Sequence, residues 1–345
     1  MRISKRQEKT ISQAIQHWED DQTIPPEMAK TLRDSYTVIG FDWKLIAVYS
    51  FWIAITCFII SIGVLLADDY LMALLAKLID TPASLLSALS ALIAAAAFWA
   101  GQRRRKVAPA KQISNEAIYF FGVLFTAVSL GFLQETSLFL QTETAPFLLL
   151  LTMIYVVLGL KLPSTLVWLF SLFSFAWWGL EQSHLWETPS GHFLGLNQPL
   201  RLVFIGVFVL IISRLFTQHA RYQPFIEPTR FIGYLYVLFA LWLVSIIGNY
   251  GDAAAWSKVP QVTLLHWGIL SCVICLGLIY YGISQEDKLA RSFGITFLLI
   301  NLYTRYFEYF WDSMHKTVFF AILALSFWLI GSHAEKLWQL SHNKS

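Results

Sequence analysis

The stretch from Ala145 to Leu180 decides the fold. It reads APFLLLLTMIYVVLGLKLPSTLVWLFSLFSFAWWGL, and its one charged residue is Lys161. A helix that crosses a bilayer needs about 20 predominantly apolar residues. The stretch holds two such runs, 145–161 and 163–180, and only Lys161-Leu162-Pro163 can turn the chain between them. It therefore predicts two adjacent membrane-spanning helices joined by a tight turn.

Apolar runs of the same kind recur along most of the chain. Only 14% of the 345 residues are charged and 57% are hydrophobic, whereas soluble domains carry about 25% charged residues. The net charge of +3 does not indicate a nucleic-acid partner. We expect an all-α, polytopic transmembrane helical bundle of about ten spans. They are predicted near 44–67, 82–101, 115–134, 145–161, 163–180, 199–217, 230–248, 262–283, 292–311 and 317–333.

The distribution of Lys and Arg predicts how these spans are oriented. Cytoplasmic loops of membrane proteins are enriched in both residues. With the N-terminus inside, 20 of the 25 Lys and Arg residues fall on cytoplasmic segments and 5 on outer segments. This predicts a multi-pass protein of a bacterial inner membrane with both termini in the cytoplasm. The cluster Arg103-Arg104-Arg105-Lys106 helps to fix that orientation, and it is also a candidate contact for anionic lipid headgroups.

Residues 1–42 are polar and are predicted to form a cytoplasmic helical hairpin, a unit separate from the transmembrane domain at 43–345. Apolar residues recur three or four positions apart, as on one face of a helix. A unit of about 40 residues is too small for a robust core of its own. We therefore expect it to dock on the membrane, on the loops or on another copy of the chain, and we favour contact with a protein partner or a second copy. The apolar positions are Ile11, Ile15 and Trp18 before the corner at Ile24-Pro25-Pro26, and Met28, Leu32, Tyr36 and Ile39 after it.

Three stretches carry a resemblance to a known family. They are QHWEDDQTIPPEMAKTLRDSY at 16–36, FGVLFTAVSL at 121–130 and NLYTRYFEYFWD at 301–312. The chain resembles a bacterial predicted-membrane-protein family catalogued as domain of unknown function 2157. Its members open with a helix, an isoleucine-then-proline corner, a second helix ending in tyrosine and then the first span. The resemblance implies no activity, cofactor or catalytic residue.

One predicted span carries an unusual polar stripe, which consists of Asn301, Arg305, Glu308, Asp312 and His315. Spacings of four, three, four and three residues place these side chains on one face of a helix. Charged residues inside a span are costly and usually face protein or a wet cavity. The stripe is therefore either a polar pathway or substrate-binding wall, or an Arg305–Glu308 pair that fixes packing while Asp312 and His315 are solvated.

Arg201 is a second candidate site, because it lies at the start of the predicted sixth span, two residues after Pro199. It either extends toward the outer headgroups or contacts an anion at the N-terminus of a helix.

Other residues that could suggest metal or redox chemistry lack the required spacing. His184 and His192 are eight residues apart, across a proline and a glycine, and Cys272-x-x-Cys275 has no further ligand nearby. No metal, cofactor or catalytic residue is predicted.

The sequence contains no P-loop, no G-x-S-x-G and no H-E-x-x-H motif. We favour a non-enzymatic membrane protein whose hairpin contacts a partner. One alternative is a transporter or channel for a small polar or anionic solute that uses the polar stripe and Arg201. Another is an intramembrane lipid-modifying enzyme with Glu308, Asp312 or His315 as acid or base. A water-filled cavity that reaches the polar stripe would favour the transporter or the enzyme. A helix bundle without such a cavity would favour the non-enzymatic membrane protein.

Overall fold

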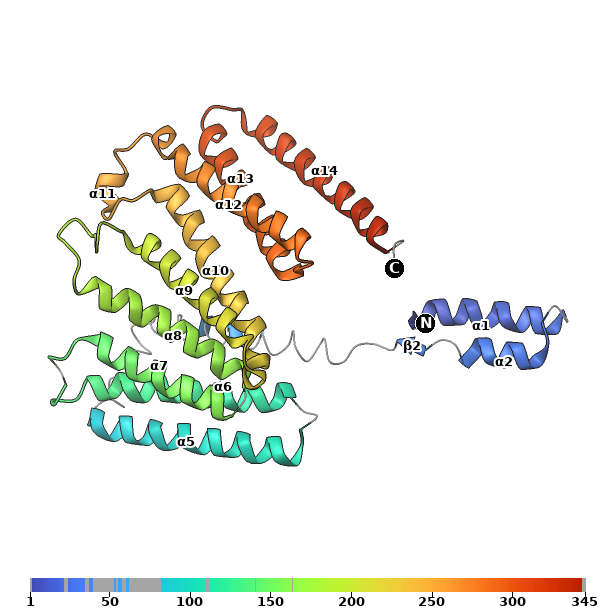
Figure 1. Cartoon of the computed structure of the whole chain (residues 1–345), viewed down its shortest axis with the longest axis horizontal. Helices are drawn as coiled ribbons and strands as arrows, with labels where there is room; N and C mark the ends of the chain where they lie inside the picture. The colour runs from blue at the N-terminus through green and yellow to red at the C-terminus, as the bar shows by residue number, and fades with distance from the viewer. Residues whose placement is uncertain are drawn as a thin grey trace. The chain divides into compact units, whose positions relative to one another are not determined.

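A computed structural model of the chain describes residues 2–21, 24–34, 37–39, 53, 55–57, 60–61, 82–109, 112–139, 141–162 and 164–342. The described residues are almost entirely helical (Figure 1), so the predicted all-α class is confirmed for them. The exception is one pair of parallel three-residue strands, β1 (Arg2–Ser4) and β2 (Thr37–Ile39). The predicted first span, 44–67, lies mostly outside the described residues.

Among the described residues, nine long helices follow the hairpin, one for each of the other predicted spans. They have apolar faces because few charged residues interrupt them. Short helices occupy some of the connections: η1 (Ala220–Tyr222), α11 (Ala253–Trp256) and η2 (Gln261–Leu264). The long helices are α5 (Ala83–Val107), α6 (Gln112–Gln134), α7 (Thr144–Lys161), α8 (Thr165–His184), α9 (Gln198–Phe216), α10 (Gln223–Ile247), α12 (Leu265–Ser284), α13 (Lys288–Phe310) and α14 (Lys316–His342).

Six helices among the described residues are long and apolar enough to cross a membrane: α5, α6, α7, α9, α10 and α12. They make the chain a multi-pass membrane protein. Helices α8, α13 and α14 coincide with predicted spans but are not in this set, and the apolar part of α14 is limited to Lys316–Leu329. The count of ten spans therefore stays a prediction.

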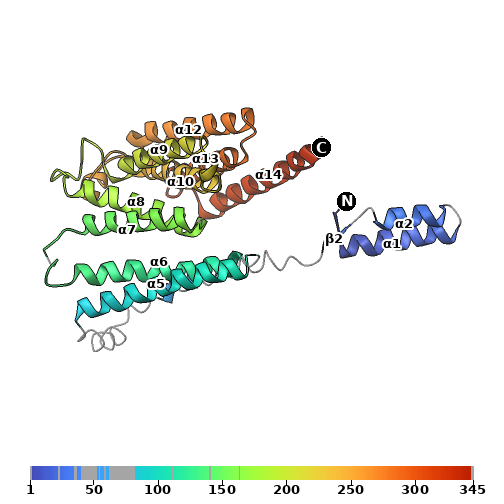
Figure 2. The ribbon, with the colours of Figure 1, turned by 60° about the horizontal axis from the view of Figure 1, so that its bottom comes forward.

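The chain divides into two compact units. The first contains the described parts of 1–82 and 99–118, and the second contains 83–98 and 119–345. In the first unit, α1 (Lys5–Asp20) and α2 (Pro26–Asp34) lie side by side as a hairpin (Figures 1 and 2). Pro26 is the first residue of α2, where its missing N–H costs nothing. The predicted domain boundary at residue 42 stays a prediction.

The second unit contains the predicted tight turn. Helix α7 ends at Lys161 and α8 begins at Thr165, and the two helices lie side by side in both views. Buried Ser164 caps α8 by accepting a hydrogen bond of 3.3 Å from the backbone N–H of Val167. The turn deduced from residues 161–163 is therefore confirmed by the ends of its two helices.

Helices α9 and α10 approach each other closely because each has a glycine at the contact. A Cβ at Gly206 would lie 2.8 Å from the backbone nitrogen of Val237, and one at Gly233 would lie 2.7 Å from Leu210 Cγ. Small residues that bring two backbones together are typical of helix pairs in membranes, where apolar burial alone does not drive association. This contact positions the ends of α9 and α10 that are described below.

Candidate functional site

Asn301, on α13, connects three helices. Its side chain is fully buried. Nδ2 donates a hydrogen bond of 3.0 Å to the backbone oxygen of Gly268 and contacts Cys272 Sγ at 3.2 Å, both on α12. Its Oδ1 lies 3.4 Å from the hydroxyl of Ser245 on α10. The amide therefore has partners inside the protein, as a polar group away from water requires.

Arg305 and Glu308 form an ion pair one turn farther along α13. Nη2 of Arg305 donates to Oε1 of Glu308 at 2.9 Å, and Nη1 lies 2.6 Å from Oε2. Nη2 also lies 3.4 Å from the Ser245 hydroxyl. The arginine packs over Gly268, where a Cβ would lie 3.4 Å from its Cδ. Both charged side chains are largely buried, so the two charges neutralise each other within the bundle.

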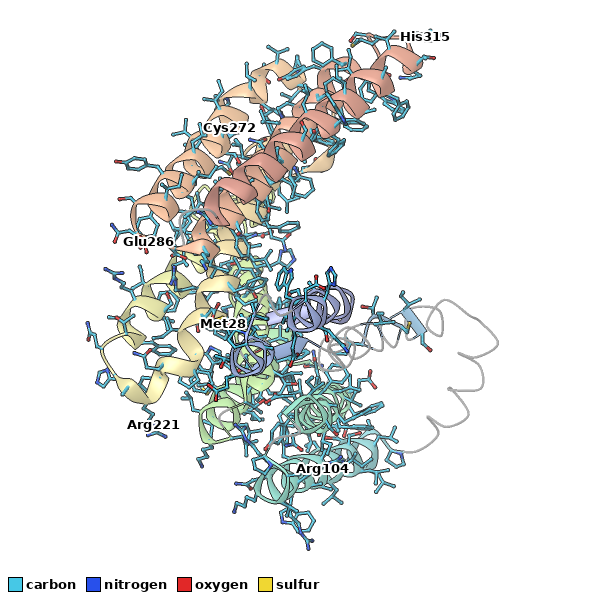
Figure 3. The ribbon with its side chains drawn as sticks, turned by 90° about the vertical axis from the view of Figure 1, so that its right-hand side faces the viewer. Met28, Arg104, Arg221, Cys272, Glu286 and His315 are labelled. Carbon is cyan, nitrogen blue, oxygen red and sulfur yellow. The ribbon has the colours of Figure 1, made fainter. Side chains whose placement is uncertain are left out.

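The predicted stripe does not continue beyond this pair, which corrects the expectation that all five residues share one helical face. Helix α13 ends at Phe310 and α14 begins at Lys316, so the chain reverses direction within residues 311–315. Asp312 and His315 are exposed in that turn, and Figure 3 shows His315 at its tip. A polar role for these two residues stays a prediction.

Arg201 is buried, with only 6% of its surface exposed. Its Nη1 donates a hydrogen bond of 2.7 Å to the hydroxyl of Ser183 on α8, and its Nη2 contacts the carboxylate of Glu187. The anion at Arg201 in the structure is therefore the protein's own Glu187. Contact with an external anion, which the sequence suggested, stays a prediction.

Glu187 lies in the loop after α8 and also accepts from Nδ1 of His184 at 2.8 Å. Burial alone would raise the pKa of Glu187, but the hydrogen bonds from His184 and Arg201 and the positive charge of Arg201 hold its pKa below the usual value. The carboxylate is therefore charged at neutral pH.

Side-chain hydrogen bonds connect the same α8–α9 loop to the loop after α10. Asn197 Nδ2 donates to the backbone oxygens of Gly248 at 2.8 Å and Tyr250 at 3.0 Å. His192 Nε2 lies 3.0 Å from the backbone oxygen of Asn249. His184 and His192 therefore have separate partners, and the described residues contain no group of three His, Cys, Asp or Glu side chains able to hold a metal ion.

The basic cluster at the end of α5 belongs to the first unit. The guanidinium of Arg103 lies over the ring of Trp99, 5.4 Å from its centroid. Arg104, labelled in Figure 3, and Lys106 are exposed. A tryptophan beside arginines is typical of a helix end at the membrane surface. Binding of anionic headgroups at this cluster stays a prediction.

A charged pocket of about 680 Å³ was not predicted from the sequence. It lies where α9 ends, α10 begins and α12 connects to α13; Figure 3 labels Glu286 in the α12–α13 connection and Arg221 in the α9–α10 connection. The pocket combines charged residues from α9, from α10 and from the α12–α13 connection with the start of α13. These segments are separated in the sequence, so no local pattern could have indicated the pocket. The charged residues that line it are Arg214, Glu227, Arg230, Glu286, Asp287 and Lys288.

A second, mostly apolar cavity of about 330 Å³ is lined by residues of α7, α8 and α9, including Val156, Leu172 and Phe216. Neither of these two cavities includes Asn301, Arg305 or Glu308. Comparisons of the chain with protein families, with curated proteins and with solved structures found no match.

Proposed function

We propose that this protein is a non-enzymatic, multi-pass membrane protein that holds a partner-contacting helical hairpin at the cytoplasmic surface. One observation carries the proposal: the side chains of Asn301, Arg305 and Glu308 on α13 have partners inside the helix bundle. Arg305 is paired with Glu308, and Asn301 is bound to α10 and α12. A transporter or an intramembrane enzyme needs its charged groups to meet substrate or water. Neither of the two described cavities provides that access.

The hairpin supports the second half of the proposal. Ile15 and Ala29 are buried between α1 and α2, whereas Trp18 and Met28 are 46% and 53% exposed. Exposed apolar side chains on a small unit are typical of a surface that another protein covers. The Lys and Arg residues of the hairpin region and its place before the spans favour a cytoplasmic location. We propose a protein partner for it, and a second copy of the chain is the simplest candidate.

The finer features belong to the same proposal. They are ten spans, a bacterial inner membrane, cytoplasmic termini and membership of the family catalogued as domain of unknown function 2157. The 20-to-5 split of Lys and Arg supports the orientation. The helical hairpin with its proline corner supports the resemblance.

Site-specific photo-crosslinking tests the partner contact. A photoreactive amino acid would replace Trp18 or Met28 in the full-length protein in membranes, with the exposed polar positions Gln16 and Glu27 as matched controls. We expect protein adducts from Trp18 and Met28 and none from the controls. A doubled molecular mass would identify a second copy. Equal adducts at all four positions, or none at Trp18 and Met28, would contradict the proposal.

The water accessibility of α13 tests the proposal that this helix does not line a transport path. A cysteine placed at Asn301, in a chain whose native cysteines are replaced by serine, should not react with a membrane-impermeant thiol reagent. A cysteine at exposed Asp312 is the matched control and should react. Labelling at position 301 from either side would show a water-filled path and would favour the transporter alternative.

A further inference from the structure

The charged pocket lies at the boundary between membrane and water. It is formed by the last turn of α9, the first turns of α10 and the connection from α12 to α13, and α9, α10 and α12 are each long and apolar enough to span. Lipid headgroups lie at this depth. Tyr234 and Tyr281 line the pocket, and tyrosines are enriched where helices leave the hydrocarbon.

One ion pair forms a fixed wall of the pocket. Arg230 binds the carboxylate of Asp287. Oδ1 of Asp287 also accepts from the backbone N–H groups of Leu289 at 3.1 Å and Ala290 at 3.2 Å, so the same carboxylate caps α13. The guanidinium of Arg230 additionally lies 5.8 Å from the ring centroid of Tyr234. The charges of Arg230 and Asp287 are therefore already paired within the protein.

Four other charges line the pocket and remain available. Arg214 and Lys288 are positive, Glu227 and Glu286 are negative, and all four are exposed. Within the described part of the chain none of them forms an ion pair. A ligand that carries both signs would match this set, whereas a purely anionic ligand would meet two carboxylates and a purely cationic one two cations.

The size and the remaining lining fit a lipid headgroup. A volume of about 680 Å³ is within the range of small-molecule sites, about 300–1,000 Å³. Leu210, Ile226 and Leu289 add apolar surface beside the charges. A glycerol backbone and the upper part of its acyl chains could contact these residues while the headgroup meets the charges.

We propose that the charged pocket binds a zwitterion that carries a phosphate and a primary ammonium group, with phosphatidylethanolamine as its source. Arg214 and Lys288 bind the phosphate, and Glu227 and Glu286 accept hydrogen bonds from the ammonium. The three residues Gln285, Glu286 and Asp287 between α12 and α13 place Glu286 beside Lys288, so that both signs face one ligand.

Glu286 also allows a charge to be removed without disturbing the turn. Its φ is 54°, a left-handed conformation that asparagine adopts more readily than glutamate. Glu286→Asn should therefore keep the turn and remove the carboxylate. Arg214→Gln removes a cation in the same way from the last turn of α9. Arg221→Gln is the matched control, because Arg221 is exposed on the neighbouring connection and does not line the pocket.

Native mass spectrometry of the full-length protein in detergent would measure the binding of phosphatidylethanolamine and phosphatidylglycerol with identical acyl chains. We expect phosphatidylethanolamine to bind about tenfold more tightly, because only it pairs with the carboxylates. Glu286→Asn should abolish the preference, Arg214→Gln should weaken both lipids about tenfold, and Arg221→Gln should change neither. Equal or tighter binding of phosphatidylglycerol to the unaltered protein would overturn the proposal, as would equal effects of Arg214→Gln and Arg221→Gln.

Binding of free phosphoethanolamine would show whether the pocket takes a lipid or a soluble molecule with the same phosphate and ammonium groups. If the pocket takes a lipid, the soluble headgroup alone should bind at least about a hundredfold more weakly, because it lacks the apolar contacts with Leu210, Ile226 and Leu289. Tight binding of phosphoethanolamine that Glu286→Asn abolishes would support the zwitterion site and assign it a soluble ligand. Binding of either compound that no pocket variant changes would overturn the site.

Discussion

Arg201 and Glu187 connect the start of α9 to the loop that follows α8. The guanidinium binds the carboxylate and also donates to Ser183, so one buried arginine joins two helices and their connecting loop. The sequence suggested Arg201 as a contact for an anion, and the nearest anion is fourteen residues earlier in the same chain. The pair therefore connects the helices at this end of the bundle without an external ligand.

Replacing Glu187 with glutamine should destabilise the protein. The buried Arg201 would lose its counter-charge while remaining surrounded by protein, which costs about 1–3 kcal/mol. Thermal unfolding of the purified protein in detergent would measure the loss. The double variant Arg201→Leu with Glu187→Leu should recover much of the stability, because it removes both charges. A double variant less stable than Glu187→Gln would show that Arg201 has a further essential partner.

The same pair predicts how stability depends on acid. The folded-state pKa of Glu187 is lowered, so its contribution to stability is present above the usual carboxyl pKa of about 4.3 and is lost as pH falls through the lowered value. The stability difference between the unaltered protein and Glu187→Gln should therefore shrink as the pH falls below about 4. A difference that does not change with pH down to pH 3 would contradict this linkage.

Much of the helical arrangement follows from local sequence. Each predicted span from 82 onward coincides with one helix, because long apolar runs and their polar ends are local signals. The face that carries Asn301, Arg305 and Glu308 follows from helical spacing alone. The end of α13 at Phe310 could not be predicted in this way, because polar residues continue the same spacing into the turn. Only the start of α14 at Lys316 shows that the chain reverses direction.

The charged pocket and the Arg201–Glu187 pair depend on which segments meet in space. Asp287 reads as an ordinary helix cap, and nothing near it in the sequence identifies Arg230, 57 positions earlier, as its partner. The glycines also show that the sequence does not reveal long-range contacts. Gly206 and Gly277 both lie in apolar helices, but of these two only Gly206 lies against the backbone of another helix. Long-range contacts of this kind leave no local pattern.

That difference between two glycines can be measured. Gly206→Ala should destabilise the protein by about 1–3 kcal/mol, because the new Cβ would lie 2.8 Å from the backbone nitrogen of Val237 and the helices would have to separate. Gly277→Ala is the matched control, with nothing within 4 Å of its Cβ. It should be neutral or stabilising by up to about 1 kcal/mol, through helix propensity. Equal effects of the two changes on the unfolding temperature would show that α9 and α10 are not in close contact.

Reporter fusions test the orientation of the spans. The alternation of positive charge predicts that fusions at Gly101 and Ser345 report a cytoplasmic location and that a fusion at Ser190 reports a periplasmic one. Gly101 precedes the basic cluster at the end of α5, and Ser190 lies in the loop between α8 and α9. A periplasmic signal at Ser345 would mean an odd number of spans, and the count of ten would be wrong.

Variants of Arg305 and Glu308 can show whether this charged pair on α13 has a structural or a functional role. Arg305→Leu alone should destabilise the protein by about 3 kcal/mol, because it leaves Glu308 largely buried without its counter-charge. The double variant Arg305→Leu with Glu308→Leu should recover most of that loss in thermal unfolding, since no isolated charge remains.

The outcome for cells expressing the double variant then decides the role of the pair. A protein that is stable and retains the crosslinks of the hairpin would support a purely structural pair. A protein that is equally stable but alters the lipid or metabolite content of the cells would show that α13 acts on a solute or a lipid, and the non-enzymatic role proposed above would be wrong. If Arg305→Leu alone leaves the unfolding temperature unchanged, the pair faces water or headgroups, because an unpaired carboxylate inside a closed bundle cannot be without cost.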